Sequence, residues 1–191
     1  MKVSREQAAL NRERVVETAS RLFRERGYGG IGVADLMRGA GLTHGGFYGN
    51  FDSKEDLMAQ AVTQAIEGGL RQWDARAEGQ PAAHALEALV GAYLSPGHRD
   101  HPGQGCAVAS LGPEVARLAA PVRCAMTEGV NKQLERLAAL MPAESSAEQR
   151  QAAIVTYASM VGALVLARAV NDEALSEEIM SAVHQAVTGM G

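Results

Sequence analysis

Cysteine and aromatic residues are scarce in this chain of 191 residues. Its two cysteines, Cys106 and Cys124, are too few for the disulfide scaffold of a small secreted protein, so we expect a cytoplasmic protein. Only eight residues are aromatic: one Trp, four Tyr and three Phe. No apolar stretch follows Met1, so no signal peptide is expected.

Proline is also infrequent, and no segment alternates apolar and polar residues over a useful length. The six prolines stand among abundant Ala, Leu, Glu and Arg, which favour helix. The hydrophobic content of 47% with a net charge of only −4 excludes a wholly disordered chain. The sequence therefore predicts an all-α globular protein.

The negative net charge argues at first against a nucleic-acid partner, but the charge is unevenly distributed. Residues 1–51 carry eight Lys or Arg against five Asp or Glu, a net charge of +3, whereas residues 52–191 carry ten against seventeen, a net of −7. A basic head on an acidic body suggests two functions in one chain.

Helical periodicity, capping residues and Pro or Gly punctuation predict nine helices. Ser4 and Gln7 have the spacing of a capping box, and Ser53, with Asp56 three residues later, is expected to start another helix. We expect the segment 96–105 to be a loop. The expected helices are 4–26, 33–39, 44–50, 53–78, 80–95, 106–119, 121–141, 146–170 and 176–188.

The stretch 152–170 is apolar almost all round, which raises the question of a membrane span. A span needs about 20 apolar residues, but Thr156, Tyr157 and Arg168 interrupt this one. A helix buried by its own domain and by a second subunit has the same composition. We therefore expect no membrane and a homodimer, in which Ala158 and Gly162 allow a partner helix to approach closely.

The segment from Val33 to Asn50 has the pattern of a helix-turn-helix: a short helix, a turn containing Gly41 and a second short helix. Gly41 supplies the left-handed backbone that such a turn needs. Phe47 and Phe51 are placed to hold the two helices against the first. The pattern alone is weak, because paired short helices are common in any α protein.

The residue identities strengthen this interpretation. The run GYGGIGVADLMRGAGLTHGGFYGNFDSKEDL, residues 27–57, resembles the N-terminal DNA-binding domain of the TetR family of transcriptional regulators. The family pattern Gly-Val-Ser-x-Gly-x-Leu-Tyr-x-x-Phe-x-Ser-Lys-Glu-x-Leu is matched by residues 41–57. The resemblance implies a DNA-binding domain at 1–52 and a ligand-binding and dimerisation domain at 53–191.

The resemblance also implies which residues contact DNA. It makes the helix at 43–50 the recognition helix that enters the major groove. The DNA-binding residues it implies are Thr43, His44, Gly45, Gly46, Tyr48, Asn50 and Lys54. Of these, Tyr48, Asn50 and Lys54 would bind phosphate, and Lys54 stands in the first turn of a helix, where free N–H groups favour an anion. The alternatives are a solvated His44 and a Tyr48 that packs in the core.

Two features depart from the family pattern. Ile31-Gly32 replaces the usual hydroxyl residues before the second helix, and Gly32 caps a helix less well than Ser. Gly45, Gly46 and Gly49 together cost the recognition helix about 3 kcal/mol relative to Ala. We therefore expect this helix to depend on Phe47 and Phe51 packing and to fray without DNA.

In the body, the resemblance implies a small-molecule pocket between helices and a dimer interface formed by the last two helices. No cluster of Arg or Asp marks a charged ligand, so we expect a small, mainly apolar or electrophilic effector. For each candidate lining residue, ordinary core packing is the alternative. The candidate ligand-binding residues are Trp73, Tyr93, Cys106, Met126, Tyr157 and Met160, and the expected interface residues are Ile154, Ala158, Val161, Val165, Ile179, Val183 and Val187.

Three further hypotheses concern His98, His101 and Cys106, which have the residue types of a zinc site. Histidines in a loop rich in Pro and Gly are more often solvated, so no metal and no cofactor are expected. Cys106 lies near a predicted helix N-terminus, which lowers a thiol's pKa, and it could act as a redox or electrophile sensor. The rival function is a small helical thiol or metal enzyme using these three residues. We expect instead a non-enzyme: a ligand-responsive repressor that binds a palindromic operator as a dimer and is released by its effector.

Overall fold

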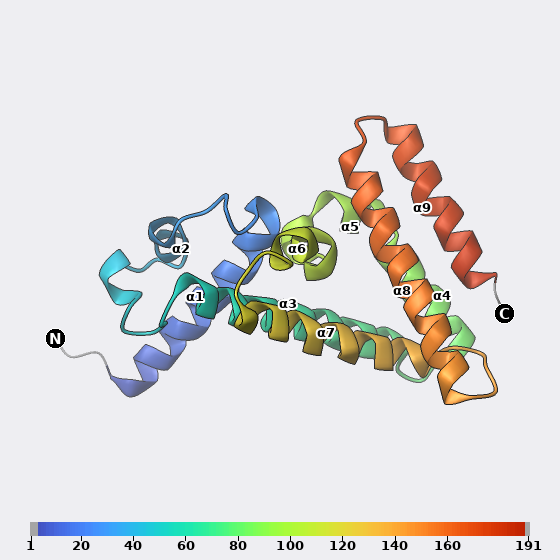
Figure 1. Cartoon of the computed structure of the whole chain (residues 1–191), viewed down its shortest axis with the longest axis horizontal. Coiled ribbons are helices and arrows are strands. Elements are labelled where there is room, and N and C mark those ends of the chain that lie inside the picture. The colour runs from blue at the N-terminus through green and yellow to red at the C-terminus, as the bar shows by residue number, and fades with distance from the viewer. Residues whose placement is uncertain (1–3, 190–191) are drawn as a thin grey trace.

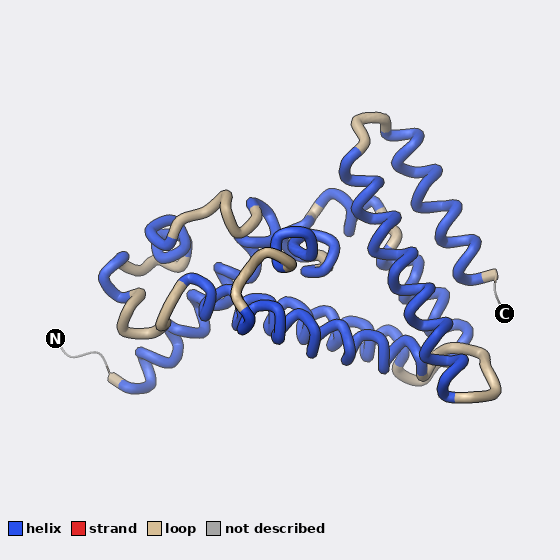
Figure 2. The backbone as a smooth tube through the Cα atoms, viewed as in Figure 1, coloured by secondary structure: helices blue, strands red, loops and turns tan. Residues whose placement is uncertain are grey.

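The computed structural model describes residues 4–189, which form helices joined by turns and loops, with no strand among them (Figures 1 and 2). Nine α-helices and two short 3-10 turns make up this part of the chain, so the predicted all-α fold with about nine helices is confirmed. The elements are α1 (Arg5–Arg26), α2 (Val33–Gly39), η1 (His44–Gly46), α3 (Lys54–Ala77), α4 (Ala82–Tyr93), α5 (Pro96–Asp100), η2 (Pro102–Gln104), α6 (Ala107–Val115), α7 (Ala120–Ala138), α8 (Ser146–Ala169) and α9 (Glu173–Thr188).

The caps predicted for the first and fourth expected helices are confirmed. Ser4 Oγ accepts a hydrogen bond from the Gln7 amide at 3.1 Å, and Ser53 Oγ accepts one from the Asp56 amide at 3.0 Å. Gly27 ends α1 with φ of +74°, a value that L side chains rarely adopt. These local signals therefore determine where α1 begins and ends and where α3 begins.

Two expectations about helix membership are wrong. The helix expected at 44–50 is only the three-residue turn η1, because three glycines in seven residues leave little helix preference. Conversely, the expected loop at 96–105 contains α5 and η2. Ser95 Oγ caps α5 by accepting the His98 amide at 3.2 Å, and Pro96 occupies its first turn.

Several other boundaries also differ from those expected. The last helix begins three residues earlier than expected, at Glu173, because Asp172 accepts the Leu175 amide and caps it. The capping box of α8 is formed by Ser145 and Glu148, so this helix begins at Ser146 as expected. Helix α6 contains Pro113 and ends at Val115, four residues before the expected end at 119. The remaining helix ends differ from those expected by a few residues.

The molecule has an elongated outline with the helix-turn-helix at one end and the α8–α9 hairpin at the other (Figure 1). The long helices α3 and α7 run side by side between these ends and pack closely, because Gly129 on α7 leaves room for Ile66 of α3. Helix α3 packs on α1, α4 and α7. One continuous apolar core thus extends from α1 to α9.

Helix α8 is long and apolar enough to cross a membrane by length and composition, with a mean hydropathy of 1.6 over its most apolar window. In this fold it packs against α6, α7 and α9. One face nevertheless stays open, with Ile154, Val165 and Leu166 exposed by 46%, 37% and 55%. Val187, expected in the dimer interface, is instead buried within its own protomer, because that side of α9 faces the core.

Candidate DNA-binding surface and effector cavity

The turn between α2 and η1 has the geometry that a helix-turn-helix requires. Gly41 has φ of +71°, and its amide donates to the Arg38 carbonyl at 2.9 Å. The next amide, that of Leu42, donates to the Met37 carbonyl at 2.9 Å, which closes the end of α2. Gly41 therefore supplies the left-handed residue that the sequence predicted for this position.

Buried phenylalanines hold the segment after this turn in place. Phe47 and Phe51 are buried, and their ring centroids lie 5.5 Å apart. Asn50 stabilises the same segment by donating from Nδ2 to the Gly46 carbonyl at 2.7 Å. The backbone of residues 43–50 is thus ordered by side-chain packing and by short-range turns rather than by a full α-helix.

The outward side of this segment carries four of the predicted DNA-binding residues in exposed positions. Thr43, His44 and Gly45 are exposed, and Tyr48 is exposed by 72%. The Tyr48 ring lies edge-on against Phe47 at 5.1 Å and against His44 at 6.3 Å, so it is supported from behind while its surface stays free. Gly46 and Asn50 are half-buried. This exposed surface, residues 43–48, is free to contact another molecule.

Lys54, the remaining predicted DNA-binding residue, is partly engaged within the protein. Its Nζ donates to the Tyr28 carbonyl at 2.5 Å and lies 4.1 Å from the centroid of the Tyr28 ring. Burial lowers the pKa of this ammonium group. Lys54 therefore fastens the start of α3 to the turn after α1, a structural role that the sequence did not indicate.

Tyr28 itself is held by a second charged residue of the α3 N-terminus. Its hydroxyl donates to Glu55 Oε1 at 2.5 Å. Burial, followed by this hydrogen bond, raises the pKa of Tyr28 to about 12, and the bond lowers the pKa of the Glu55 carboxyl. The α1–α2 turn and the start of α3 thus form one rigid unit.

In the body, a cavity of about 470 Å³ lies between α3, α4, the segment 95–106 and α7. Its lining combines apolar residues with amides, histidines and Arg76, and includes no Asp or Glu among the residues that the structure describes. The lining residues that matter below are Trp73, Tyr93, His98, Gly105, Cys106 and Gln133. A larger hollow of about 1,020 Å³ between the start of α4, the α7–α8 loop and the end of α9 contains none of the six predicted ligand-binding residues.

A chain of polar side chains lies in and behind the cavity wall. Tyr157 donates from its hydroxyl to Gln133 Oε1 at 2.6 Å, and the same hydroxyl lies 3.7 Å from Cys106 Sγ. The Tyr93 hydroxyl is buried without a hydrogen-bond partner among the described residues. Burial raises the pKa of both tyrosines well above its ordinary value, so both remain neutral donors at neutral pH.

His98 is fixed at both ring nitrogens. Its Nδ1 lies 2.6 Å from the Tyr93 carbonyl, and its Nε2 accepts the backbone N–H of Cys106 at 2.8 Å. This pattern requires a neutral ring with the proton on Nδ1. Burial lowers the pKa of His98, and the neighbouring Arg168, Arg24 and Arg76 lower it further.

The structure brings together some of the predicted ligand-binding residues and separates others. Trp73, Tyr93 and Cys106 line the cavity, and Tyr157 lies behind it with its ring 6.1 Å from that of Trp73. Met126 and Met160 are core residues outside the lining. Sequence reasoning missed Gln133, a buried polar residue on the inner side of α7, and it considered His98 only as a metal ligand or an enzyme residue. Neither has a local sequence signal, because both depend on how distant helices pack.

The zinc hypothesis finds no geometric support among the described residues of this region. His101 Nδ1 hydrogen-bonds the Gly97 carbonyl at 2.9 Å, and both nitrogens of His98 are already engaged. Across residues 4–189, no group of three or more His, Cys, Asp or Glu side chains is arranged to hold a metal ion. Cys106 occupies the N-cap position of α6 without a capping hydrogen bond from its side chain, and its half-buried free thiol lies in the cavity wall, as the thiol-sensor hypothesis requires.

Comparisons with known proteins identify the N-terminal region. Residues 15–61 match the family model described as bacterial regulatory proteins, tetR family. The HTH-type transcriptional repressor DhaR of Mycobacterium sp. (strain GP1) is 29% identical over 114 residues, which are 59% of this chain and 56% of that protein. The chain thus aligns with little more than half of this curated relative.

Solved structures resemble the whole chain. The reduced form of E. coli NemR has a TM-score of 0.79 at 22% identity and covers 94% of this chain and 95% of its own. A TetR-family regulator from Agrobacterium tumefaciens has a TM-score of 0.78 at 19% identity, covering 94% and 98%. These likenesses concern the fold alone. Together with the geometry of the helix-turn-helix, the comparisons lead to one statement: the N-terminal region of this chain matches the tetR family of bacterial regulatory proteins, and the whole chain has the fold of solved TetR-family regulators.

Proposed function

We propose that this protein is a cytoplasmic transcriptional repressor that binds DNA as a homodimer and is released by a small-molecule effector. The observation that carries the proposal is the exposed surface of residues 43–48, supported from behind by the buried Phe47 and Phe51. Thr43 and His44 are free there to contact base edges, and Tyr48 is free to contact phosphate. The name of the curated relative DhaR, a repressor, supports the direction of regulation.

The open face of α8 supports the homodimer. Ile154, Val165 and Leu166 lie exposed on it, and a Cβ at Gly162 would have open space around it. An exposed apolar stripe of this kind favours association with a second apolar surface. Pairing two copies through α8 and α9 would give a DNA-binding protein with two recognition segments, as a palindromic operator needs.

The cavity of about 470 Å³ supports a small effector, because its size and mixed lining are typical of ligand pockets. The lining contains no carboxylate, so an organic cation has no partner there. A small, mainly apolar molecule with one hydrogen-bond acceptor fits it best. The buried Tyr93 hydroxyl, which lacks a partner among the described residues, is the group best placed to donate to that acceptor.

The proposal is tested by selecting operator sequences from random DNA with the full-length protein and measuring affinity by fluorescence anisotropy. We expect a selected sequence with two related half-sites. His44→Ala should reduce the preference for that sequence by about 10-fold, equivalent to one lost base contact of about 1.4 kcal/mol. Tyr48→Phe should weaken binding equally on all sequences. Failure to enrich any sequence, combined with no affinity for DNA, would refute the proposal.

A further inference from the structure

The segment that forms one wall of the cavity also contacts the DNA-binding end of the molecule. This segment, residues 95–106, is called here the linking segment. It contributes Ser95, His98, His101 and Cys106 to the cavity lining. Its other side packs on α1 through η2, where a Cβ added to Gly103 would collide with the Glu25 side chain. The linking segment therefore lies between the proposed effector and α1.

One peptide group joins these two sides. The peptide between Gly105 and Cys106 donates its N–H to His98 Nε2 at 2.8 Å and accepts a hydrogen bond through its carbonyl from Arg24 Nη1 of α1 at 2.8 Å. A peptide unit is planar, so its N–H and C=O turn together. Any movement of the His98 ring that rotates this peptide must also disturb the bond to Arg24.

The absence of a side chain at Gly105 makes this arrangement possible. A Cβ there would lie 2.6 Å from His98 Cδ2 and 3.0 Å from Arg168 Nη2. The φ of Gly105 is −93°, a value open to any residue, so close packing rather than backbone conformation requires glycine. The peptide is thus wedged between the His98 ring and Arg168, with Arg24 at its carbonyl.

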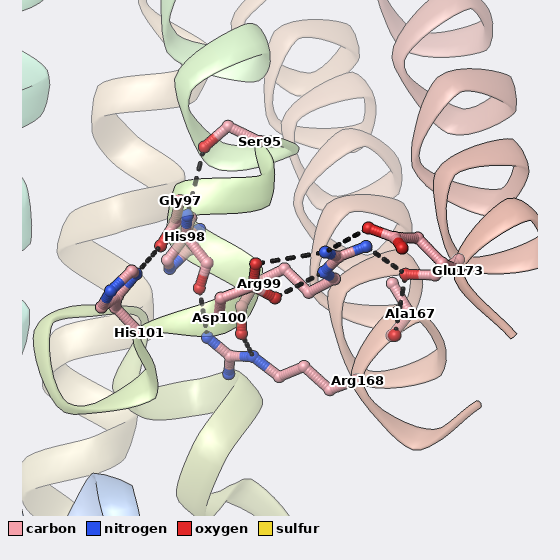
Figure 3. Close-up of polar contacts among 10 residues, drawn as sticks. Ser95, Gly97, His98, Arg99, Asp100, His101, Ala167, Arg168 and Glu173 are labelled. Carbon is pink, nitrogen blue, oxygen red and sulfur yellow. Dashed lines mark hydrogen bonds and ion pairs between the residues drawn. The ribbon is translucent and has the colours of Figure 1, made fainter. Parts of the chain in front are cut away.

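The rest of the linking segment is fastened to the α8–α9 hairpin (Figure 3). Arg168 of α8 donates from Nη2 to the His98 carbonyl at 2.7 Å and from Nε to the Arg99 carbonyl at 3.0 Å. Arg99 donates in turn to Ser176 Oγ of α9 at 3.1 Å. The backbone of α5 is therefore held to α8 and α9. The His98 ring lies in the cavity lining, and the Gly105–Cys106 peptide lies between this ring and α1.

A second set of hydrogen bonds connects the Gly105–Cys106 peptide, through α6, to the turn after α1. Helix α6 begins immediately after the Gly105–Cys106 peptide, and its Glu114 accepts the backbone amides of Tyr28 at 2.8 Å and Gly29 at 3.3 Å. The Tyr28 segment is bonded to Lys54 and Glu55 at the start of α3. A shift at the peptide thus reaches the base of the helix-turn-helix from two points.

We infer that the Gly105–Cys106 peptide couples the cavity to α1: an occupant that displaces the His98 ring rotates this peptide, releases Arg24 and loosens the helix-turn-helix. The inference rests on the proposed function for its biological meaning. Its physical content is a coupling between cavity occupancy and the order of α1, which is measurable without DNA and without the natural effector.

The test places a defined occupant in the cavity through Cys106. In a Cys124→Ser background, which removes the exposed second thiol, benzyl methanethiosulfonate transfers its benzylthio group to Cys106. The cysteine sulfur bonds to the reagent sulfur, methanesulfinate leaves and the thiol proton goes to solvent. Hydrogen exchange is then measured at the amides of residues 23–29, and affinity is measured for the selected operator.

Labelling should raise exchange at residues 23–29 and weaken operator binding by about 10-fold, within the usual range of allosteric coupling. Arg24→Met should bring the ratio of labelled to unlabelled affinity close to one. Arg21→Met is the matched control, because Arg21 lies exposed on the same helix and, among residues 4–189, its side chain pairs only with Glu25. It should leave the ratio unchanged.

A pair of glycine variants tests the same step without labelling. Gly105→Ala should raise exchange at residues 23–29, because its Cβ displaces the His98 ring. Gly112→Ala on α6 should not, because its Cβ would meet only Val108 Cγ1 at 3.9 Å. The inference is overturned if labelling leaves exchange unchanged or if Arg24→Met keeps the full ratio. Should the unlabelled protein fail to bind DNA, the proposed function falls, and the exchange measurement still decides the inference.

Discussion

At the scale of single residues, His98 has the most demanding position. Its Nε2 accepts a hydrogen bond from the Cys106 amide, and its Nδ1 contacts the Tyr93 carbonyl. Protonation of the ring would put a hydrogen on Nε2, and two N–H donors would then face each other. Burial lowers its pKa in the folded protein. The ring is therefore stable in this arrangement only while it is neutral.

This arrangement predicts a pH dependence of stability. The unfolded chain takes up the His98 proton near pH 6.5, whereas the folded chain takes it up at lower pH, so stability falls as pH decreases below about 6.5. The loss is at most about 1.4 kcal/mol per pH unit for one proton. Urea unfolding at pH 7.5, 6.5 and 5.5 should show this slope in the wild type and a smaller slope in His98→Gln. The exposed His84→Gln is the control, and an equal slope in wild type and His98→Gln would contradict the prediction.

Lys54 carries two roles that one substitution separates. It donates to the Tyr28 carbonyl, and the family resemblance also implies a phosphate contact. Lys54→Met keeps the apolar stem but removes the charge. If Lys54 also neutralises a phosphate, the slope of log K against log[salt] should fall by about 2 for a dimer, at about 0.9 per phosphate. A weaker affinity with an unchanged slope would instead leave Lys54 with its structural role alone.

At the scale of elements, residues 43–50, the recognition segment, depart most from expectation. Packing positions this segment, but only His44–Gly46 within it forms a 3-10 turn. Of its glycines, Gly45 would have open space around an added Cβ, and a Cβ at Gly49 would meet only the Gly46 carbonyl at 3.9 Å. Packing therefore does not require glycine at 45 or 49.

Alanine at these positions should convert the turn toward helix. Gly45→Ala and Gly49→Ala each add about 1 kcal/mol of helix preference. We expect slower amide exchange over residues 44–50 and more helix by circular dichroism. Gly41→Ala is the contrasting variant, because its φ of +71° penalises a side chain and should destabilise the turn. Exchange in the wild-type segment as slow as in α1 would contradict the expectation that it frays without DNA.

The elements that sequence reasoning predicted correctly are those with strong local signals. The ends of α1 and the start of α3 follow from Ser4, Gly27 and Ser53. The helix α5 was missed because its Pro and Gly content resembles a loop, although Ser95 and Pro96 form a sufficient cap. In this segment the helix-starting residues Ser95 and Pro96 stand beside glycines that favour a loop. The packing of α5 against α8 favours the helix.

The candidate site was predictable only in part for a related reason. Trp73, Tyr93 and Cys106 come from α3, α4 and the start of α6, and they meet because these helices pack around one cavity. Their aromatic or thiol character made them candidates. The role of His98 depends on the chain folding back over eight residues to the Cys106 amide, which no periodicity in the sequence reveals.

At the scale of the whole molecule, the exposed face of α8 carries the apolar side chains Ile154, Val155, Val165 and Leu166, which are not covered by any described part of the chain. Placing a charge at its centre should prevent the proposed pairing of two copies. Gly162→Arg should convert a dimer to a monomer in sedimentation equilibrium, because the buried guanidinium would have no partner. Thr127→Arg, on an exposed position of α7, is the matched control. A Gly162→Arg protein that remains dimeric would place the interface elsewhere.

The distribution of charge fits the same arrangement. The basic first 51 residues and the acidic remainder would place two positive ends on a negative body in a dimer, so that only the ends approach DNA. Binding should therefore depend on phosphate contacts made by the N-terminal ends alone.

The salt dependence of operator affinity is the decisive measurement for a DNA-binding role. Affinity of the full-length protein for its selected operator is measured by anisotropy between about 50 and 300 mM salt. We predict a linear fall of log K against log[salt], with a half-site preference that His44→Ala relaxes. No measurable DNA binding at low salt, or binding that is independent of salt, would contradict this role.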